Sequence, residues 1–86
     1  MPNITVSVTC AIPHWVTVDA TDVPNNPGNV VLAVGSHALI WGVMGSPGDS
    51  FSAELKDGAR VVCTVSNWTI PHGSSGWSGD AASFNV

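Results

Sequence analysis

The chain has 86 residues, which is enough for one domain with a single small core, and we expect residues 1–86 to fold as one unit. Charged residues make up only 9% of the chain against 44% hydrophobic ones, and Lys56 and Arg60 are the only fixed cations in a formal net charge of −4. This shortage of cations argues against nucleic-acid binding, which needs several Lys or Arg side chains, and against docking on an anionic membrane.

The first third of the chain contains two predicted strands and a loop. Apolar and polar residues alternate over residues 4–10, and the alternation resumes over residues 14–19 after Pro13, which is the period-two pattern of half-buried strands. Residues 22–29 combine prolines, which lack a backbone donor, with Asn and Gly, which tolerate positive φ. This segment is therefore predicted to be a loop.

The central third is the most apolar part of the chain. Residues 30–34 and 37–44 are almost entirely hydrophobic, and the second segment is apolar at both odd and even positions. This pattern predicts a central strand that is covered on both sides, and it leaves a short buried helix open as the alternative. A turn is predicted at residues 46–49, followed by another alternating strand at residues 51–55.

The last third reads as a hairpin, a loop and a closing strand. Lys56, Asp57 and Gly58 predict a tight turn into a strand over residues 60–67. Residues 71–79 are rich in Gly and Ser and predict a loop, and residues 81–86 predict the last strand.

About seven short strands without helical periodicity predict an all-β fold, namely a small single-domain β-sandwich. An immunoglobulin-like topology is favoured over a small barrel. The spacing of Cys and Trp does not match that of true immunoglobulin domains, so the architecture is predicted without a family.

Two cysteines, Cys10 and Cys63, lie in predicted strands far apart in the sequence. Such a pair suits one disulfide between an early and a late strand, and the alternative is two buried free thiols. Which form is present depends on the compartment. The sequence carries no signal-peptide pattern and no apolar stretch of ~18–20 residues, so the chain is extracellular if a leader was removed and cytoplasmic otherwise.

Catalytic signatures are missing from the sequence. No serine lies in a GxSxG context, the six acids fall in or beside predicted turns, and no glycine loop ends in a Lys-Ser or Lys-Thr pair. The three histidines, His14, His37 and His72, are not spaced as a local metal chelate. We therefore expect a protein that is not an enzyme and that needs no cofactor.

The loop that follows residue 18 is the best candidate for a metal site. Asp19 and Asp22 supply carboxylates and Asn25 and Asn26 supply amides, and oxygen ligands of this kind are those that calcium prefers. The Asn-Pro-Gly entry into the next strand resembles loops of calcium-dependent β-sandwich lectins, over these few residues alone. Ordinary turn chemistry is the alternative explanation of the same composition.

Four Trp residues in a chain without Tyr point to a binding surface. Trp stacks on the apolar faces of sugars and is frequent at protein interfaces. Trp77 is flanked by Gly and Ser, and Trp15 and Trp68 lie near strand ends, whereas Trp41 belongs to the most apolar segment and is predicted to be core. The alternative for each of these residues is that its indole fills the small core under the loops.

The leading hypothesis is a non-catalytic binding module for carbohydrate or another neutral polar ligand, contacted by Trp68, Trp77, Asn25 and Asn26. A protein ligand is a further option for the same surface. The alternative class is a structural or self-assembling subunit of a surface or capsid, in which low charge permits packing between copies. A homo-oligomer would favour this second class.

Overall fold

The structure is a computed structural model that describes all residues from 1 to 86. It contains eight strands and no helix, and therefore no helical segment suited to crossing a membrane. The strands are β1 (Asn3–Thr9), β2 (His14–Val18), β3 (Thr21–Asp22), β4 (Gly28–Val31), β5 (Ser36–Met44), β6 (Ser50–Asp57), β7 (Arg60–Thr69) and β8 (Trp77–Asn85).

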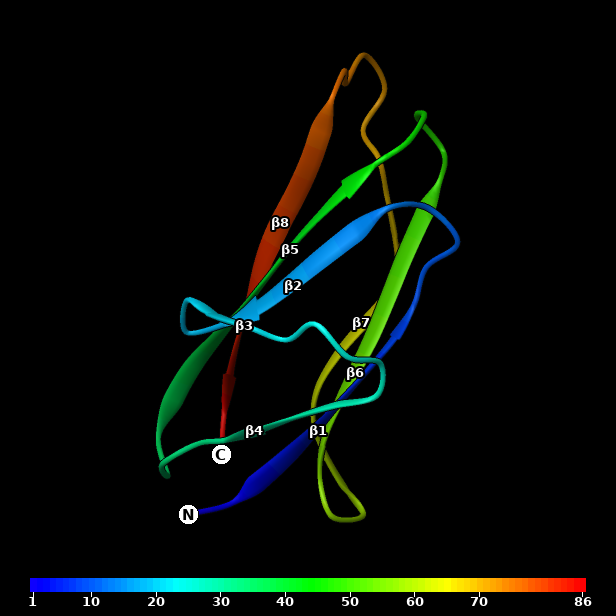
Figure 1. The fold of residues 1–86 in the computed structure, drawn as a ribbon. Helices are drawn as coiled ribbons and strands as arrows, with labels where there is room; N and C mark the ends of the chain where they lie inside the picture. Colours follow the sequence, from blue (N-terminus) through cyan, green and yellow to red (C-terminus); the bar gives the residue numbers. More distant parts are fainter.

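These strands form two antiparallel sheets, which confirms the predicted β-sandwich with eight strands in place of about seven. One sheet has the order β4-β1-β6-β7 and the other has the order β3-β2-β5-β8. Figure 1 shows the two layers, with β2, β5 and β8 side by side in one of them and β1, β6 and β7 in the other.

The topology is that of a four-stranded ribbon folded in half. Segments that follow each other in the chain occupy the same rank in opposite sheets, so that β1 matches β2, β3 matches β4, β5 matches β6 and β7 matches β8. In immunoglobulin constant domains the first two strands are instead neighbours in one sheet. The predicted sandwich is thus present, with a strand order different from the immunoglobulin arrangement.

The core lies between the sheets and is built by the alternating residues that the sequence indicated. Trp41 on β5 stacks on Phe51 on β6 with ring centroids 5.4 Å apart, and this pair joins the two layers. The Nε1 atom of Trp41 is buried without a hydrogen-bond partner. The other fully buried side chains are those of Ile4, Val6, Val18, Leu39, Val43 and Leu55.

The outer face of the first sheet is polar, and we call it the hydroxyl face. Apart from Val61 on β7, which is exposed and paired with Lys56, most of its outward side chains on the three longest strands carry hydroxyl or charged groups. They are Thr5, Ser7 and Thr9 on β1, Ser52, Glu54 and Lys56 on β6, and Thr64 on β7.

Two expectations about the strands were wrong. β5 is covered on one side only, because Leu39, Trp41 and Val43 are buried while Ile40 and Met44 are 38% and 41% exposed. The last strand begins at Trp77 rather than at residue 81, so part of the predicted loop over residues 71–79 is strand. The first difference arises because apolar residues of β5 face solvent, and periodicity alone reads such positions as buried. The second arises because Ser78 and Gly79, whose residue types favour loops, pair with β5.

Candidate functional site

The outer face of the second sheet gathers four of the eight large exposed hydrophobic side chains. Trp15 is 43% exposed and Trp77 is 52% exposed, and Ile40 and Met44 lie on β5, the strand between theirs. We call this surface the aromatic face. Its outward residues on the three longest strands are Trp15 and Thr17 on β2, Ala38, Ile40, Gly42 and Met44 on β5, and Trp77, Gly79 and Ala81 on β8.

A row of small residues makes room for the indole of Trp15. Trp15 is paired with Gly42, and Gly42 is paired with Gly79, so the three residues cross the sheet in one line. A Cβ atom at residue 42 would collide with Cε2, Nε1 and Cζ2 of Trp15, which places the indole directly over Gly42. The ring is therefore held against the sheet surface, with almost half of the residue left open to solvent.

Trp77 provides the second ring at a diagonal position. It is paired with Met44, two residues along β5 from Gly42, and it lies two strands away from Trp15. With strands ~4.8 Å apart and ~3.3 Å per residue, the Cα atoms of Trp15 and Trp77 are about 12 Å apart. The two rings thus bracket a surface that carries no charged side chain.

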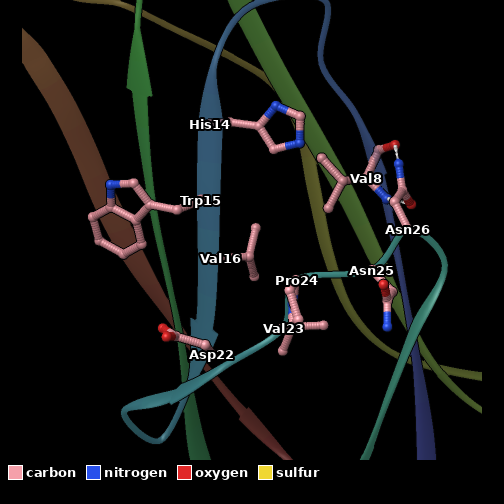
Figure 2. A pocket seen from close by; sticks show the side chains of 9 residues that line it. All are labelled: Val8, His14, Trp15, Val16, Asp22, Val23, Pro24, Asn25 and Asn26. Atoms are coloured by element: carbon pink, nitrogen blue, oxygen red, sulfur yellow. Dashed lines mark hydrogen bonds between the residues drawn. The ribbon is translucent and has the colours of Figure 1, made fainter.

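A cleft of about 380 Å³ opens beside Trp15. β3 pairs with β2 only at Thr17 and Val18, so the residues of β2 before them have no strand neighbour on this side. The gap is lined by residues of β1, of β2 and of the segment that runs from β3 into the next loop (Figure 2): Val8, His14, Trp15, Val16, Asp22, Val23, Pro24, Asn25 and Asn26. In Figure 2, Trp15 and Asp22 project to one side of β2 and His14 projects to the other.

The loop that borders this cleft is fixed by Asn26. Its Nδ2 donates to the carbonyl of Val8 over 2.7 Å, and its Oδ1 accepts from the Val8 amide over 2.9 Å. The Asn26 side chain thus makes the pair of hydrogen bonds with Val8 that a neighbouring strand would otherwise make. On the other side of the cleft, the amide of Val23 donates to the carbonyl of Val16 on β2. The peptide bond between Asn26 and Pro27 is cis.

The predicted ligand residues are divided between different parts of the molecule. Trp77 is exposed, whereas Trp68 is half-buried and packs edge-on against Trp41 with ring centroids 5.9 Å apart. Asn25 lines the cleft, and the side chain of Asn26 is taken up by β1.

Sequence reasoning placed Trp15 near a strand end but did not choose it as a ligand contact, although its ring lines the cleft together with Asp22 and Asn25. The phase of the alternation in β2 was the available signal. Val16 and Val18 are buried, so Trp15 and Thr17 point outward.

Asp19 and Asp22 both line a second cleft, of about 500 Å³, together with His37. Asp19 forms an ion pair with Nδ1 of His37, and its Oδ1 accepts from the Ala38 amide over 2.9 Å. Asp22 also lines the cleft beside Trp15, and no group of three His, Cys, Asp or Glu side chains gathers in the structure. The Asp19 carboxylate is thus engaged by His37 and Ala38, and a calcium site at Asp19 and Asp22 stays a prediction.

His37 clamps three segments together. Nδ1 contacts Asp19 in the turn after β2, and Nε2 lies 2.6 Å from the carbonyl oxygen of Ala33 in the loop before β5. Both partners are acceptors, so the ring satisfies both as an imidazolium that donates twice. These hydrogen bonds, that to Asp19 first, raise the pKa of His37, and the hydrogen bond from His37 lowers the pKa of Asp19.

Of the two alternatives for the cysteines, the structure has the free thiols. Cys63 is paired with Leu55 and Leu55 with Val6, whereas Cys10 lies four residues beyond Val6. Two strand spacings and four residues separate the Cα atoms by roughly 15 Å, whereas a disulfide needs about 7 Å or less. Both thiols are half-buried, and burial raises the pKa of the Cys63 thiol.

Comparison of the chain with protein-family models, with curated proteins and with solved structures found no match in any of the three. The aromatic face and its cleft are therefore interpreted from their own geometry.

Proposed function

We propose that the protein is a non-catalytic binding module that recognises a neutral carbohydrate through the aromatic face. The observation that carries this proposal is the pair of exposed rings, Trp15 and Trp77, on one sheet surface without charged side chains between them. Indole rings stack on the apolar faces of sugars, while their N–H groups reach a hydrogen-bond partner.

The margin of the face supports this ligand class. Stacking fixes a sugar ring only in one direction, so recognition also needs hydrogen-bonding groups beside the aromatic ring. Asp22 is paired with Thr17 on the outer face next to Trp15, and both Asp22 and Asn25 line the adjoining cleft. A carboxylate, a hydroxyl and an amide there match the hydroxyl groups of a neutral sugar.

The distance between the rings favours a chain of sugars over a monosaccharide. Cα atoms about 12 Å apart on one sheet place Trp15 and Trp77 under different units of one oligosaccharide. A flat surface with two platforms suits an extended ligand that lies diagonally across β2, β5 and β8.

The test measures binding of the purified chain to a panel of neutral polysaccharides by co-sedimentation and titration calorimetry. Trp15→Ala and Trp77→Ala should each weaken binding of the best ligand about tenfold or more, the effect of losing about 1.4 kcal/mol of contact energy. Val61→Ala, which removes an exposed apolar side chain from the other sheet, should leave affinity unchanged. A panel without a ligand, or equal affinities for all variants, contradicts the proposal.

A structural or self-assembling subunit is the second candidate, and Ile40 and Met44 favour it. These aliphatic side chains are exposed on β5, the strand between those of the two Trp residues, where a partner packed on the face would bury them. Light scattering separates the candidates: a chain that binds sugar and whose mass is unchanged by Ile40→Ser supports the first. Ordered oligomers that dissociate on Ile40→Ser or Trp15→Ala support the second.

A further inference from the structure

The four edges of the two sheets differ in how they are protected. β3 has two residues and β4 has four, which leaves little backbone to pair with. β7 has ten residues, but its pairing with β6 shifts register twice. β8 pairs with β5 residue for residue over nine positions without a shift, and no strand lies on its other side (Figure 1).

The free backbone groups of β8 follow from its pairing with β5. Gly35 and Val86 exchange both of their hydrogen bonds, so the even-numbered residues of β8 face β5 and the odd-numbered ones face away. The amide of Ala81 agrees with this direction, because it donates to Oδ1 of the preceding residue, Asp80, over 2.8 Å and not to a carbonyl of β5. The residues with outward amides and carbonyls are Trp77, Gly79, Ala81, Ser83 and Asn85.

The usual means of blocking an edge are nearly absent from β8. Natural sheets blunt their edges with Lys, Pro, bulges or short strands. β8 contains neither Lys nor Pro and shows no bulge, and its only charged side chain is that of Asp80. The side chains around its midpoint are small, because residues 79, 81, 82 and 83 are Gly, Ala, Ala and Ser.

We propose that β8 is a dimerisation edge, at which a second copy of the chain pairs antiparallel about a two-fold axis at Ala81. Ala81 then faces its own counterpart, and Gly79 faces Ser83 of the other copy. Each of these residues has its amide and carbonyl directed outward, so the register satisfies all five outward-facing residues of both strands.

The occupant is a second copy because the edge is complementary to itself. The small residues at the midpoint allow close approach without a side-chain clash, and the pairing closes as a dimer with no further free β8 edge. The two sheets join into one eight-stranded sheet, and the two aromatic faces become one continuous surface. This proposal is independent of sugar binding, since it uses the edge and not the face.

The test uses the full chain in sedimentation and light scattering over a wide concentration range. The wild-type chain should approach twice the mass of one chain as concentration rises. Ala81→Lys and Ala81→Glu should each be monomeric, because like charges meet at the two-fold axis. An equimolar mixture of these two variants should regain the dimer, whereas Thr64→Lys, the same charge change on the hydroxyl face, should dimerise like the wild type.

Asp80→Ala provides a second measurement. It removes the carboxylate that accepts a hydrogen bond from the Ala81 amide, together with one like charge from each copy. The dissociation constant of the dimer should therefore fall at least several-fold. Circular dichroism and melting of each variant distinguish lost pairing from lost folding. A monomeric wild-type chain at every concentration, a dimer that survives Ala81→Lys, or growth beyond two chains overturns the proposal.

Discussion

The two outer faces of the sandwich have opposite chemistry although they cover the same core. The hydroxyl face carries Thr and Ser side chains, and both fixed cations lie in its sheet, where Lys56 pairs with Glu54 over 3.3 Å and Arg60 with Asp57 over 3.4 Å. The aromatic face has two exposed Trp rings and no cation, and its one carboxylate, that of Asp22, lies at its margin. In a chain with so few charges, keeping the cations on one sheet leaves the other suited to an uncharged partner.

The largest expected effect comes from the core that supports both faces. Phe51 is fully buried and stacks on Trp41, so Phe51→Ala should lower the free energy of unfolding by about 3–5 kcal/mol. Urea denaturation followed by Trp fluorescence measures this change. A loss below about 1 kcal/mol would mean that the two layers hold together without this pair.

A smaller effect should separate the faces. A Cβ atom at residue 79 would collide with the backbone carbonyl of Trp41, so Gly79→Ala should cost about 1–3 kcal/mol of unfolding free energy. Thr64→Ala on the hydroxyl face, where the side chain is exposed, should cost within about 0.5 kcal/mol. Equal costs for the two variants would contradict the close packing assigned to the glycine row.

The His37 clamp should make stability depend on pH. The pKa of His37 is raised in the folded state, so its contribution is complete below the unfolded value of 6.5 and is lost as pH rises through the folded value. The pKa of Asp19 is lowered, so the same contact weakens only as pH falls below 3.8. The melting temperature should therefore decline from pH 6 to 8.5 in the wild type and stay nearly flat in His37→Gln. Parallel profiles for the two proteins would exclude the clamp.

The smallest effect belongs to the ion pairs of the hydroxyl-face sheet. Lys56 and Glu54 are both almost half exposed, and such pairs contribute little because water screens them. Lys56→Gln should change the free energy of unfolding by about 0.5 kcal/mol or less, and 1 M NaCl should remove the difference. A larger loss would show that the charged side chains of this sheet contribute to the fold.

Sequence patterns predicted the strands better than their surroundings. Alternation located the first two strands to within one residue at each end, because local periodicity follows directly from strand geometry. The same reasoning predicted wrongly that both sides of β5 are buried. An apolar residue on an exposed surface gives the same pattern as one in a core.

The site depended on information that the sequence does not carry locally. Trp68 and Trp77 both lie next to loops, yet only Trp77 is exposed, because Trp68 meets Trp41 across the sandwich. The position of Trp15 over Gly42 depends on strand register, which is set by long-range pairing. The pairing of Asn26 with β1 is equally invisible to local patterns.

The folded ribbon has a kinetic consequence. Of the six strand pairs, only β2–β3 and β6–β7 join consecutive strands, and the other four close long loops before any hydrogen bond forms. Closing those loops costs conformational entropy before core packing stabilises the chain, so folding should take milliseconds to seconds rather than microseconds. We therefore expect the β6–β7 hairpin to form first. β8 pairs only with β5, so it should join its sheet late in folding.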